Sequence, residues 1–211
     1  MAKALLINGS PRPNGCTYTA LKEVADTLEK EGIETEIIQI GKEAIRGCMA
    51  CGYCSSHDGC VINDIVNEVR GKLAEADALI VGSPVYYGSP NGNLISFLDR
   101  LFYSKGKDID LRMKVGASVV TCRRSGNTAS FDMLNKYFTI SQMPVASSNY
   151  WNNVHGFTAE DVLKDKEGLQ TMRTLGRNIA FLIKSIALGK EHFGLPQAEA
   201  VHEFTSFPDG K

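Results

Sequence analysis

The 211-residue sequence lacks the features of a membrane protein or a nucleic-acid-binding protein. Its longest apolar runs, such as 78–81 and 179–183, are far shorter than the roughly 18 residues that a membrane-spanning helix needs. Lys and Arg (23) nearly balance Asp and Glu (24), so the net charge of -1 does not attract polyanions. The first apolar stretch is too short for a secretory signal, and no small-residue cleavage site follows it. We therefore expect a cytoplasmic protein with no nucleic-acid or membrane partner.

Several common nucleotide-binding and catalytic motifs are also missing. No two glycines are separated by a single residue, which excludes G-x-G-x-x-G, and G-x-x-x-x-G-K-[ST] is absent. No cysteine is followed six positions later by the arginine that a small phosphatase needs. G-x-S-x-G and H-E-x-x-H are absent as well. These absences exclude a Rossmann dinucleotide finger, a P-loop NTPase and the commonest hydrolases. Without the dinucleotide finger, no residue of the sequence indicates whether NADH or NADPH is preferred.

Apolar runs of strand length alternate with amphipathic stretches along the chain, which predicts a β-α-β-α domain. The strands are expected at 4–8, 33–40, 78–83 and 115–121, with a fifth near 143–147 that contains Pro144. Most read as buried on both faces, as in a parallel sheet, but Glu34 and Glu36 mark the second as an edge. The pattern predicts a three-layer, doubly wound, parallel five-stranded sheet in the order 2-1-3-4-5. A ligand is then expected between the first and third strands, where the order reverses.

The helices and the domain organisation follow from the same periodicity. One helix is expected to start at Ser89 and Pro90, and a long final helix to cover about 158–188. No repeat or linker divides the chain, so we expect one domain over 1–190, with a cysteine-rich loop at 46–62 inside it and a C-terminal tail at 191–211. The segment 151–156 has no assigned chemistry, and Thr158 with Asp161 indicates a helix N-cap after it.

Two loops follow strands at the expected reversal point. The first, at 8–18, reads N-G-S-P-R-P-N-G-C-T-Y and leads into a helix, whose unpaired N–H groups and dipole favour a phosphate. Ordinary turns and helix caps have the same composition, but the position in the sheet favours the phosphate. The second, at 82–92, reads G-S-P-V-Y-Y-G-S-P-N-G. Its prolines fix the backbone, and its tyrosines offer flat surfaces to a planar ring, although either tyrosine alone is equally typical of a partly buried aromatic residue.

Together the two loops resemble those of the flavodoxin-like, NAD(P)H-dependent FMN reductase and quinone reductase group. That group pairs G-S-x-R-x-x-(G/S)-x-T with S-P-x-Y-x-(G/S), and the resemblance covers nearly the whole chain. It implies a flavodoxin-like fold, bound FMN, NAD(P)H as a transient co-substrate, and a homodimer or homotetramer. The phosphate would be held by Ser10, Arg12, Asn14, Gly15, Cys16 and Thr17. The isoalloxazine would lie against Pro84, Val85, Tyr86, Tyr87 and Gly88.

Two further features bear on this resemblance. Cys16 departs from the family, in which Asn or Ser is common, although its backbone N–H can still bind the phosphate. The loop after the fourth strand corresponds to one that lies beside the flavin ring in the family. Its candidate flavin-binding residues are Thr121, Arg123, Arg124 and Gly126. An arginine here can offset negative charge on the reduced flavin, and a solvated surface arginine is the alternative for each.

Four of the six cysteines crowd into residues 48–60. They are Cys48, Cys51, Cys54 and Cys60. The C-x2-C-x2-C start lets one tight loop reach three corners of an iron-sulfur cubane, and the fourth thiolate follows a five-residue spacer. Structural zinc sites generally separate their chelating pairs by a longer stretch, and a disulfide framework is unexpected in a reducing compartment. The spacing resembles that of iron-sulfur flavoproteins, a branch of the same family in which a [4Fe-4S] cluster passes electrons to FMN.

The resemblance implies an FMN-dependent oxidoreductase that moves electrons between NAD(P)H or an electron carrier and a small acceptor such as a quinone or a flavin. Hydride would arrive at and leave from the flavin N5, so no catalytic side chain is expected. With a cluster, a ferredoxin-like protein is the expected electron donor. Three alternatives remain open: a non-enzymatic flavodoxin-like carrier, a reductase whose cysteines remain free thiols or oxidise in pairs, and a metal-binding regulator without flavin.

Overall fold

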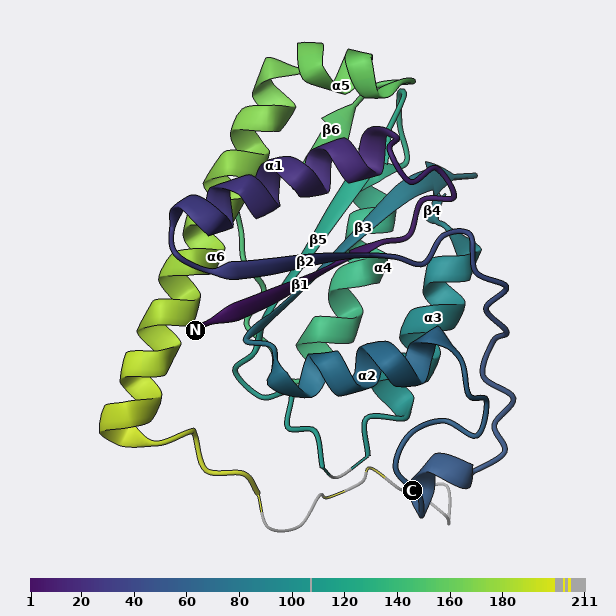
Figure 1. The fold of residues 1–211 in the computed structure, drawn as a ribbon, viewed down its shortest axis with the longest axis vertical. Coiled ribbons are helices and arrows are strands. Elements are labelled where there is room, and N and C mark those ends of the chain that lie inside the picture. Colours follow the sequence, from purple (N-terminus) through teal and green to yellow (C-terminus); the bar gives the residue numbers. More distant parts are fainter. Residues whose placement is uncertain (107, 200–202, 204, 206–211) are drawn as a thin grey trace.

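A parallel β-sheet forms the centre of the computed structural model, which describes residues 1–106, 108–199, 203 and 205. Its five parallel strands lie in the order β2-β1-β3-β5-β6 (Figure 1). They are β1 (Lys3–Asn8), β2 (Glu34–Gln39), β3 (Ala78–Tyr86), β5 (Val115–Cys122) and β6 (Asn153–His155). Counting only these parallel strands, the order is 2-1-3-4-5. The doubly wound sheet predicted from the sequence is therefore confirmed.

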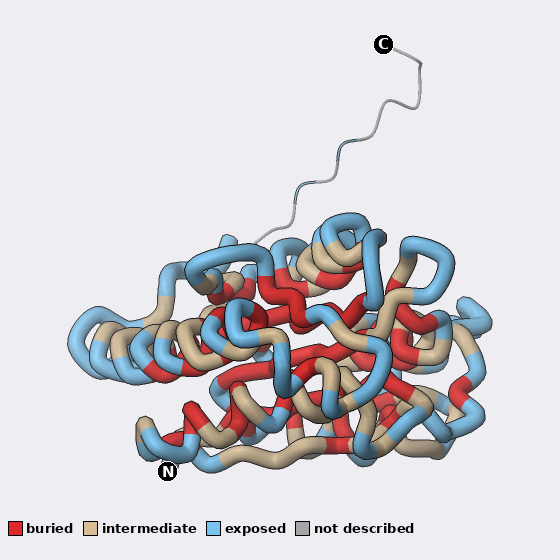
Figure 2. Tube along the Cα trace, turned by 90° about the horizontal axis from the view of Figure 1, so that it is seen from above, coloured by how far each residue is buried: buried red, intermediate tan, exposed pale blue. Residues whose placement is uncertain are grey.

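Helices cover both faces of this sheet and complete the three layers. One apolar core packs α1 (Cys16–Lys30), α5 (Ala159–Lys164) and α6 (Lys166–Phe193) against the sheet. The other core packs α2 (Ile65–Glu75), α3 (Gly92–Tyr103) and α4 (Asn127–Ile140) against the opposite face. Figure 2 shows the buried residues gathered between the exposed outer surfaces of the helices. No helix in the described ranges is long and apolar enough to cross a membrane.

The charged strand lies at the edge of the sheet, as its sequence predicts. β2 pairs only with β1 among the described strands, and Glu34 on it is exposed. Glu36 accepts a hydrogen bond from Lys72 (2.6 Å) and forms an ion pair with Lys3 (3.3 Å). These contacts pin the edge strand to α2 and β1 through paired charges rather than through apolar burial.

The predicted fifth strand at 143–147 is wrong. In this segment Val145 forms only an isolated bridge with Gly116, and Pro144 has no N–H to give to a ladder. The fifth parallel strand is instead β6, which pairs with Val120, Thr121 and Cys122 of β5. This displacement matters because it moves the loop after β6 to the carboxyl edge of the sheet.

Two helix boundaries also differ from the sequence prediction. The single helix expected over 158–188 is wrong, since Thr158 caps α5 and the Asp165 side chain starts α6 by accepting from Gly168 N–H at 2.9 Å. The helix start at Ser89 and Pro90 is also wrong. These two residues form β4 (Ser89–Pro90), a hairpin partner of β3, and the Asn91 side chain caps α3.

The C-terminal boundary of the predicted domain falls in the last turn of a helix. α6 continues to Phe193, so residue 190 is still helical. Much of the predicted 191–211 tail lies outside the described residues.

Candidate functional site

A cleft of about 280 Å³ opens at the carboxyl edge of the sheet, where β1, β3, β5 and β6 all end. It brings together most of the residues expected to bind FMN. The expected residues that line it are Ser10, Arg12, Cys16, Thr17, Pro84, Val85, Tyr86, Thr121 and Arg123. The others lie next to these in the same loops but do not line the cleft: Asn14, Gly15, Tyr87, Gly88, Arg124 and Gly126.

The N-terminus of α1 faces this cleft, and no side chain of the described residues caps it. Gly15 is the N-cap residue and brings no capping side chain, and no acidic residue lies in the first turn. The first N–H groups of a helix have no partner within the helix, and the helix dipole makes this end positive. Burial raises the pKa of the Cys16 thiol, so this side chain stays neutral and places no negative charge beside a bound anion. The arrangement suits the phosphate of a nucleotide.

Hydrogen bonds hold the loops around the cleft in place. The side chains of Thr17 and Thr121 lie 2.9 Å apart, oxygen to oxygen, and join α1 to β5. Asn91 Nδ2 donates to the Gly9 carbonyl (2.6 Å), while its backbone N–H donates to Ser83 Oγ (2.9 Å). The first two loops are therefore fixed to one another before any ligand binds.

A tight hairpin after β3 forms one wall of the cleft. Its turn residues Tyr87 (φ 51°) and Gly88 (φ 74°) both have positive φ, as a two-residue hairpin turn with the right-handed strand twist requires. This turn directs the Tyr87 side chain fully into solvent. Gly126 packs against the hairpin so closely that a Cβ atom would lie 2.8 Å from Gly88 Cα and 2.9 Å from Val85 Cγ1.

Three lining residues were missed from the sequence: Cys122, Gly156 and Phe157. The last two follow β6, and the Arg123 guanidinium lies over the Phe157 ring at 5.4 Å from its centroid. Gly156 and Phe157 were missed because the fifth strand was expected at 143–147. Correct placement of β6 would have indicated them, since loops after parallel strands meet at one edge of the sheet.

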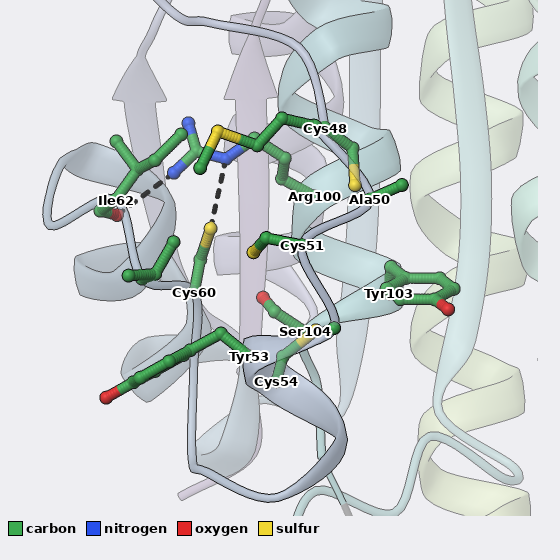
Figure 3. A pocket seen from close by; sticks show the side chains of 13 residues that line it. Cys48, Ala50, Cys51, Tyr53, Cys54, Cys60, Ile62, Arg100, Tyr103 and Ser104 are labelled. Carbon is green, nitrogen blue, oxygen red and sulfur yellow. Dashed lines mark hydrogen bonds between the residues drawn. The ribbon is translucent and has the colours of Figure 1, made fainter.

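The four clustered cysteines line a second cavity, away from the cleft. Cys48, Cys51, Cys54 and Cys60 line it together with Arg100, Tyr103 and Ser104 at the end of α3. In Figure 3 the Arg100 guanidinium reaches Cys60, whereas the Tyr103 ring points away from the cysteines. All six cysteines of the chain, each within the described residues, are free thiols. Positive φ angles at Ala50 (51°) and Gly52 (73°) turn the backbone on either side of Cys51.

The backbone of Cys60 is held by α2. Asn67 Oδ1 accepts from the Cys60 N–H (2.8 Å), and Asn67 Nδ2 donates to the Cys60 carbonyl (2.9 Å). Gly59 permits this approach, because a Cβ there would lie 2.9 Å from Asn67 Oδ1. The fourth thiol is thus positioned by a helix rather than by a free loop.

The four thiols that line this cavity are ligands of the type that an iron-sulfur cluster requires. In the described ranges, no three His, Cys, Asp or Glu side chains are grouped as they would be around one metal ion. A cubane differs, because each thiolate binds its own iron at a separate corner, so the ligands surround a space instead of meeting at a point. Ser104 Oγ lies on this cavity, is buried and has no hydrogen-bond partner among the described residues. A cluster sulfur would give that hydroxyl an acceptor.

The two sites lie at opposite ends of α3. Asn91 caps the N-terminus of this helix beside the cleft, whereas Tyr103 and Ser104 at its C-terminus contact the cysteine cavity. Twelve helical residues span about 18 Å at 1.5 Å per residue. In Figure 1 the loop after β2 runs down the side of the molecule, past α3, to the short turn η1 (Tyr53–Ser55).

A parallel sheet in this order, with a first loop that leads into an uncapped helix N-terminus and an aromatic loop after the third strand, is typical of the flavodoxin-like class of flavoproteins. The family model of NADPH-dependent FMN reductases matches residues 2–158, and the chain belongs to this family. FMN is the cofactor of the family. A protein from Methanocaldococcus jannaschii named an iron-sulfur flavoprotein is 35% identical over 87% of this chain and 98% of its own length. An iron-sulfur flavoprotein of Methanosarcina thermophila is 29% identical over 88% of this chain and 97% of its own length.

Solved structures show the same fold at low sequence identity. An NAD(P)H:quinone oxidoreductase from Methanothermobacter marburgensis superposes with a TM-score of 0.65 at 16% identity, covering 84% of this chain and 95% of that one. RosB, with a bound riboflavin-phosphate derivative, superposes with a TM-score of 0.68 at 15% identity, covering 99% and 93%.

Proposed function

We propose that this chain is an FMN-dependent oxidoreductase that takes electrons from NAD(P)H or an electron carrier and gives them to a small acceptor such as a quinone or a flavin. The observation that carries the proposal is the uncapped N-terminus of α1, which faces a cleft formed by loops at the reversal point of the sheet. The FMN phosphate would bind the N–H groups of α1 together with Ser10, Arg12 and Thr17. Family membership supports the same cofactor.

The ring of FMN would lie along Pro84, Val85 and Tyr86, with Arg123 and Phe157 on the opposite side of the cleft. When bound, FMN supplies the redox chemistry, accepting a hydride and releasing electrons singly or in pairs. The protein contributes the position of the ring, exclusion of water and positive charge. Arg12 and Arg123 both line the cleft, and none of the described residues that line it is acidic, so the two arginines would offset negative charge on a reduced flavin.

We further propose a [4Fe-4S] cluster held by the four cysteine thiolates of the second cavity. Its support is the shared cavity, the Ser104 hydroxyl, which has no hydrogen-bond partner among the described residues, and the names of the relatives from two methanogens. Cys48 and Cys51 are exposed, so this site lies at the surface, where a ferredoxin-like carrier protein can approach. The cleft and the cysteine cavity of one chain are separated by the length of α3. We therefore propose a homo-oligomer, in which the cysteine cavity of one subunit would lie closer to the cleft of its neighbour.

The first experiment is anaerobic purification followed by a visible spectrum and quantification of FMN, iron and sulfide per chain. FMN with about four irons per chain supports both proposals. Flavin without iron would leave an FMN reductase whose cysteine loop holds no cluster. Absence of flavin would overturn the central proposal, and colourless protein with stoichiometric zinc would favour the metal-binding regulator.

Two further measurements separate the remaining alternatives. Steady oxidation of NAD(P)H with a quinone or free flavin supports an enzyme, and reduction only by a partner protein would favour a flavodoxin-like carrier. The Cys51→Ser variant should lose the iron-sulfur absorbance and keep FMN, because the two sites lie at opposite ends of α3. Loss of both groups together would show that the sites are not independent.

A further inference from the structure

Arg100, on the last turn of α3, is the largest fully buried side chain among the described residues, with 1% of its surface exposed. All five of its N–H donors have acceptors. Two go to the carboxylate of Asp64, from Nη1 at 2.6 Å and from Nη2 at 2.9 Å. Two go to the carbonyls of Arg46 (3.3 Å) and Ile62 (3.0 Å). The fifth, from Nε, goes to Cys60 Sγ at 3.4 Å (Figure 3).

The guanidinium therefore points its Nε–H at one of the four thiols of the cysteine cavity. Arginine stays protonated in proteins, so this is a positive donor beside the sulfur atom. Asp64 pairs with the opposite edge of the guanidinium, through the two Nη atoms, and leaves Nε free for the sulfur. The carboxylate consequently offsets part of the charge without replacing the hydrogen bond to Cys60.

Ser104 adds a second donor on the same side of α3. It lies four residues after Arg100, one helical turn further, and the two residues line the same cavity. Its hydroxyl is buried and has no partner in the described part of the chain. An O–H in such a place is available to a sulfur atom inside the cavity.

We propose that Arg100 is a positioning residue that raises the reduction potential of the cluster through its hydrogen bond to Cys60, with Ser104 adding a smaller effect. The inference rests on the proposed cluster. Reduction would add one electron and no atom, so the net charge of the cluster with its thiolates would become more negative by one unit, and only part of this charge would reach each sulfur atom. A buried donor such as Arg100 would stabilise the reduced form more than the oxidised form, because the interaction strengthens with the charge on the acceptor.

A purely structural role would have a different signature. Arg100 also closes the cysteine loop, since Arg46 lies just before its first thiol and Ile62 just after its last. If Arg100 only closed the loop, its substitution would lower the amount of cluster bound. A substitution of Asp64 would have the same effect, although it removes the opposite charge. Tuning by charge predicts instead that removal of the positive and of the negative partner shifts the potential in opposite directions.

The test is an anaerobic titration with dithionite, followed by electron paramagnetic resonance, on the holoprotein with iron and sulfide quantified for each variant. Arg100→Gln should make the potential more negative, and Arg100→Lys should lie between it and the wild type. Asp64→Asn should make it more positive, and Ser104→Ala should make it slightly more negative. Arg173→Gln is the control. Arg173 on α6 pairs with Glu23 of α1 at 2.7 Å, on the other face of the sheet, so this variant should stay near the wild-type potential.

Equal potentials in fully loaded Arg100→Gln and wild-type protein would overturn the inference, as would shifts of the same sign in Arg100→Gln and Asp64→Asn. If Arg100→Gln does not assemble a cluster, Asp64→Asn and Ser104→Ala decide, and unchanged potentials in both would overturn it. Wild-type protein with FMN but no iron would remove the proposed cluster itself and the inference with it. A loaded wild type whose potential none of these substitutions moves would remove only the inference.

Discussion

The hydroxyl oxygens of Thr17 and Thr121 lie 2.9 Å apart. Thr17 is 1% exposed and Thr121 is 4% exposed, so one buried hydrogen bond joins the start of α1 to the end of β5. Thr121→Val should lower the free energy of unfolding by about 1–3 kcal/mol, because it leaves the Thr17 hydroxyl buried without its partner. The double variant Thr17→Val with Thr121→Val should recover part of this loss. Urea unfolding of the wild type, Thr121→Val and the double variant measures the effect, and a double variant no more stable than Thr121→Val would contradict it.

Gly126 is required by its backbone and by its neighbours. Its φ is +86°, and a Cβ would lie 2.8 Å from Gly88 Cα. Gly126→Ala should therefore destabilise the fold by roughly 1–2 kcal/mol and weaken FMN binding, because the hairpin that forms one wall of the cleft must move. Gly92→Ala is the matched control, since nothing lies within 4 Å of a Cβ at Gly92. Thermal unfolding and fluorescence titration with FMN measure both quantities, and similar behaviour of the two variants would refute the prediction.

Arg12 lines the cleft beside the N-terminus of α1. Arg12→Ala should weaken FMN binding about tenfold, equivalent to about 1.4 kcal/mol, because a charge-assisted contact to the phosphate is lost. Its affinity for riboflavin, which has no phosphate, should stay unchanged. Titrations at two salt concentrations give a further check, since the variant should also depend less on salt. Equal loss for FMN and riboflavin would place Arg12 at the ring instead of the phosphate.

Glu36 provides a pH-dependent contribution to the sheet edge. The hydrogen bond from Lys72, followed by that from Lys3, holds the pKa of this carboxyl below its usual range, against the opposing effect of burial. A lowered pKa means that the stabilisation is fully present above the ordinary carboxyl pKa and is lost as the pH falls through the lowered value. Glu36→Gln should thus cost about 0.5–1 kcal/mol at pH 7 and nothing once the wild-type carboxyl is protonated. Unfolding curves at pH 7 and pH 3 give the comparison, and a constant difference between them would contradict it.

Sequence periodicity was sufficient for the sheet order and for the loops that meet at its carboxyl edge. The reason is that long apolar strands such as β1 and β3 are buried on both faces and leave little choice of arrangement. β6 was not predicted because its three residues, Asn153 to His155, are too few to show the alternation of apolar and polar residues that marks a strand. Its place is set by contacts with β5, which are distant in sequence.

The surroundings of the cysteines were only partly predictable. Their spacing indicated a common site, but Arg100 and Ser104 come from a helix about forty residues later and carry no local signal of that role. An arginine in a helix is ordinarily a surface residue. Only the packing of α3 against the loop reveals that this one is buried with its donors directed at Cys60, Asp64 and the ends of the loop.

The closure of the cysteine loop by Arg100 makes that loop a separable module. After β2 the chain runs away from the sheet. The Arg100 guanidinium donates to the carbonyls of Arg46 and Ile62, and so it joins the two ends of the segment between them before α2 begins. No strand of the central sheet lies between these two points. A change of length or sequence confined to this segment therefore leaves every strand of the sheet, and the cleft at its carboxyl edge, with its own sequence. The cysteine site and the cleft can vary independently in evolution, because they are built by different segments of the chain.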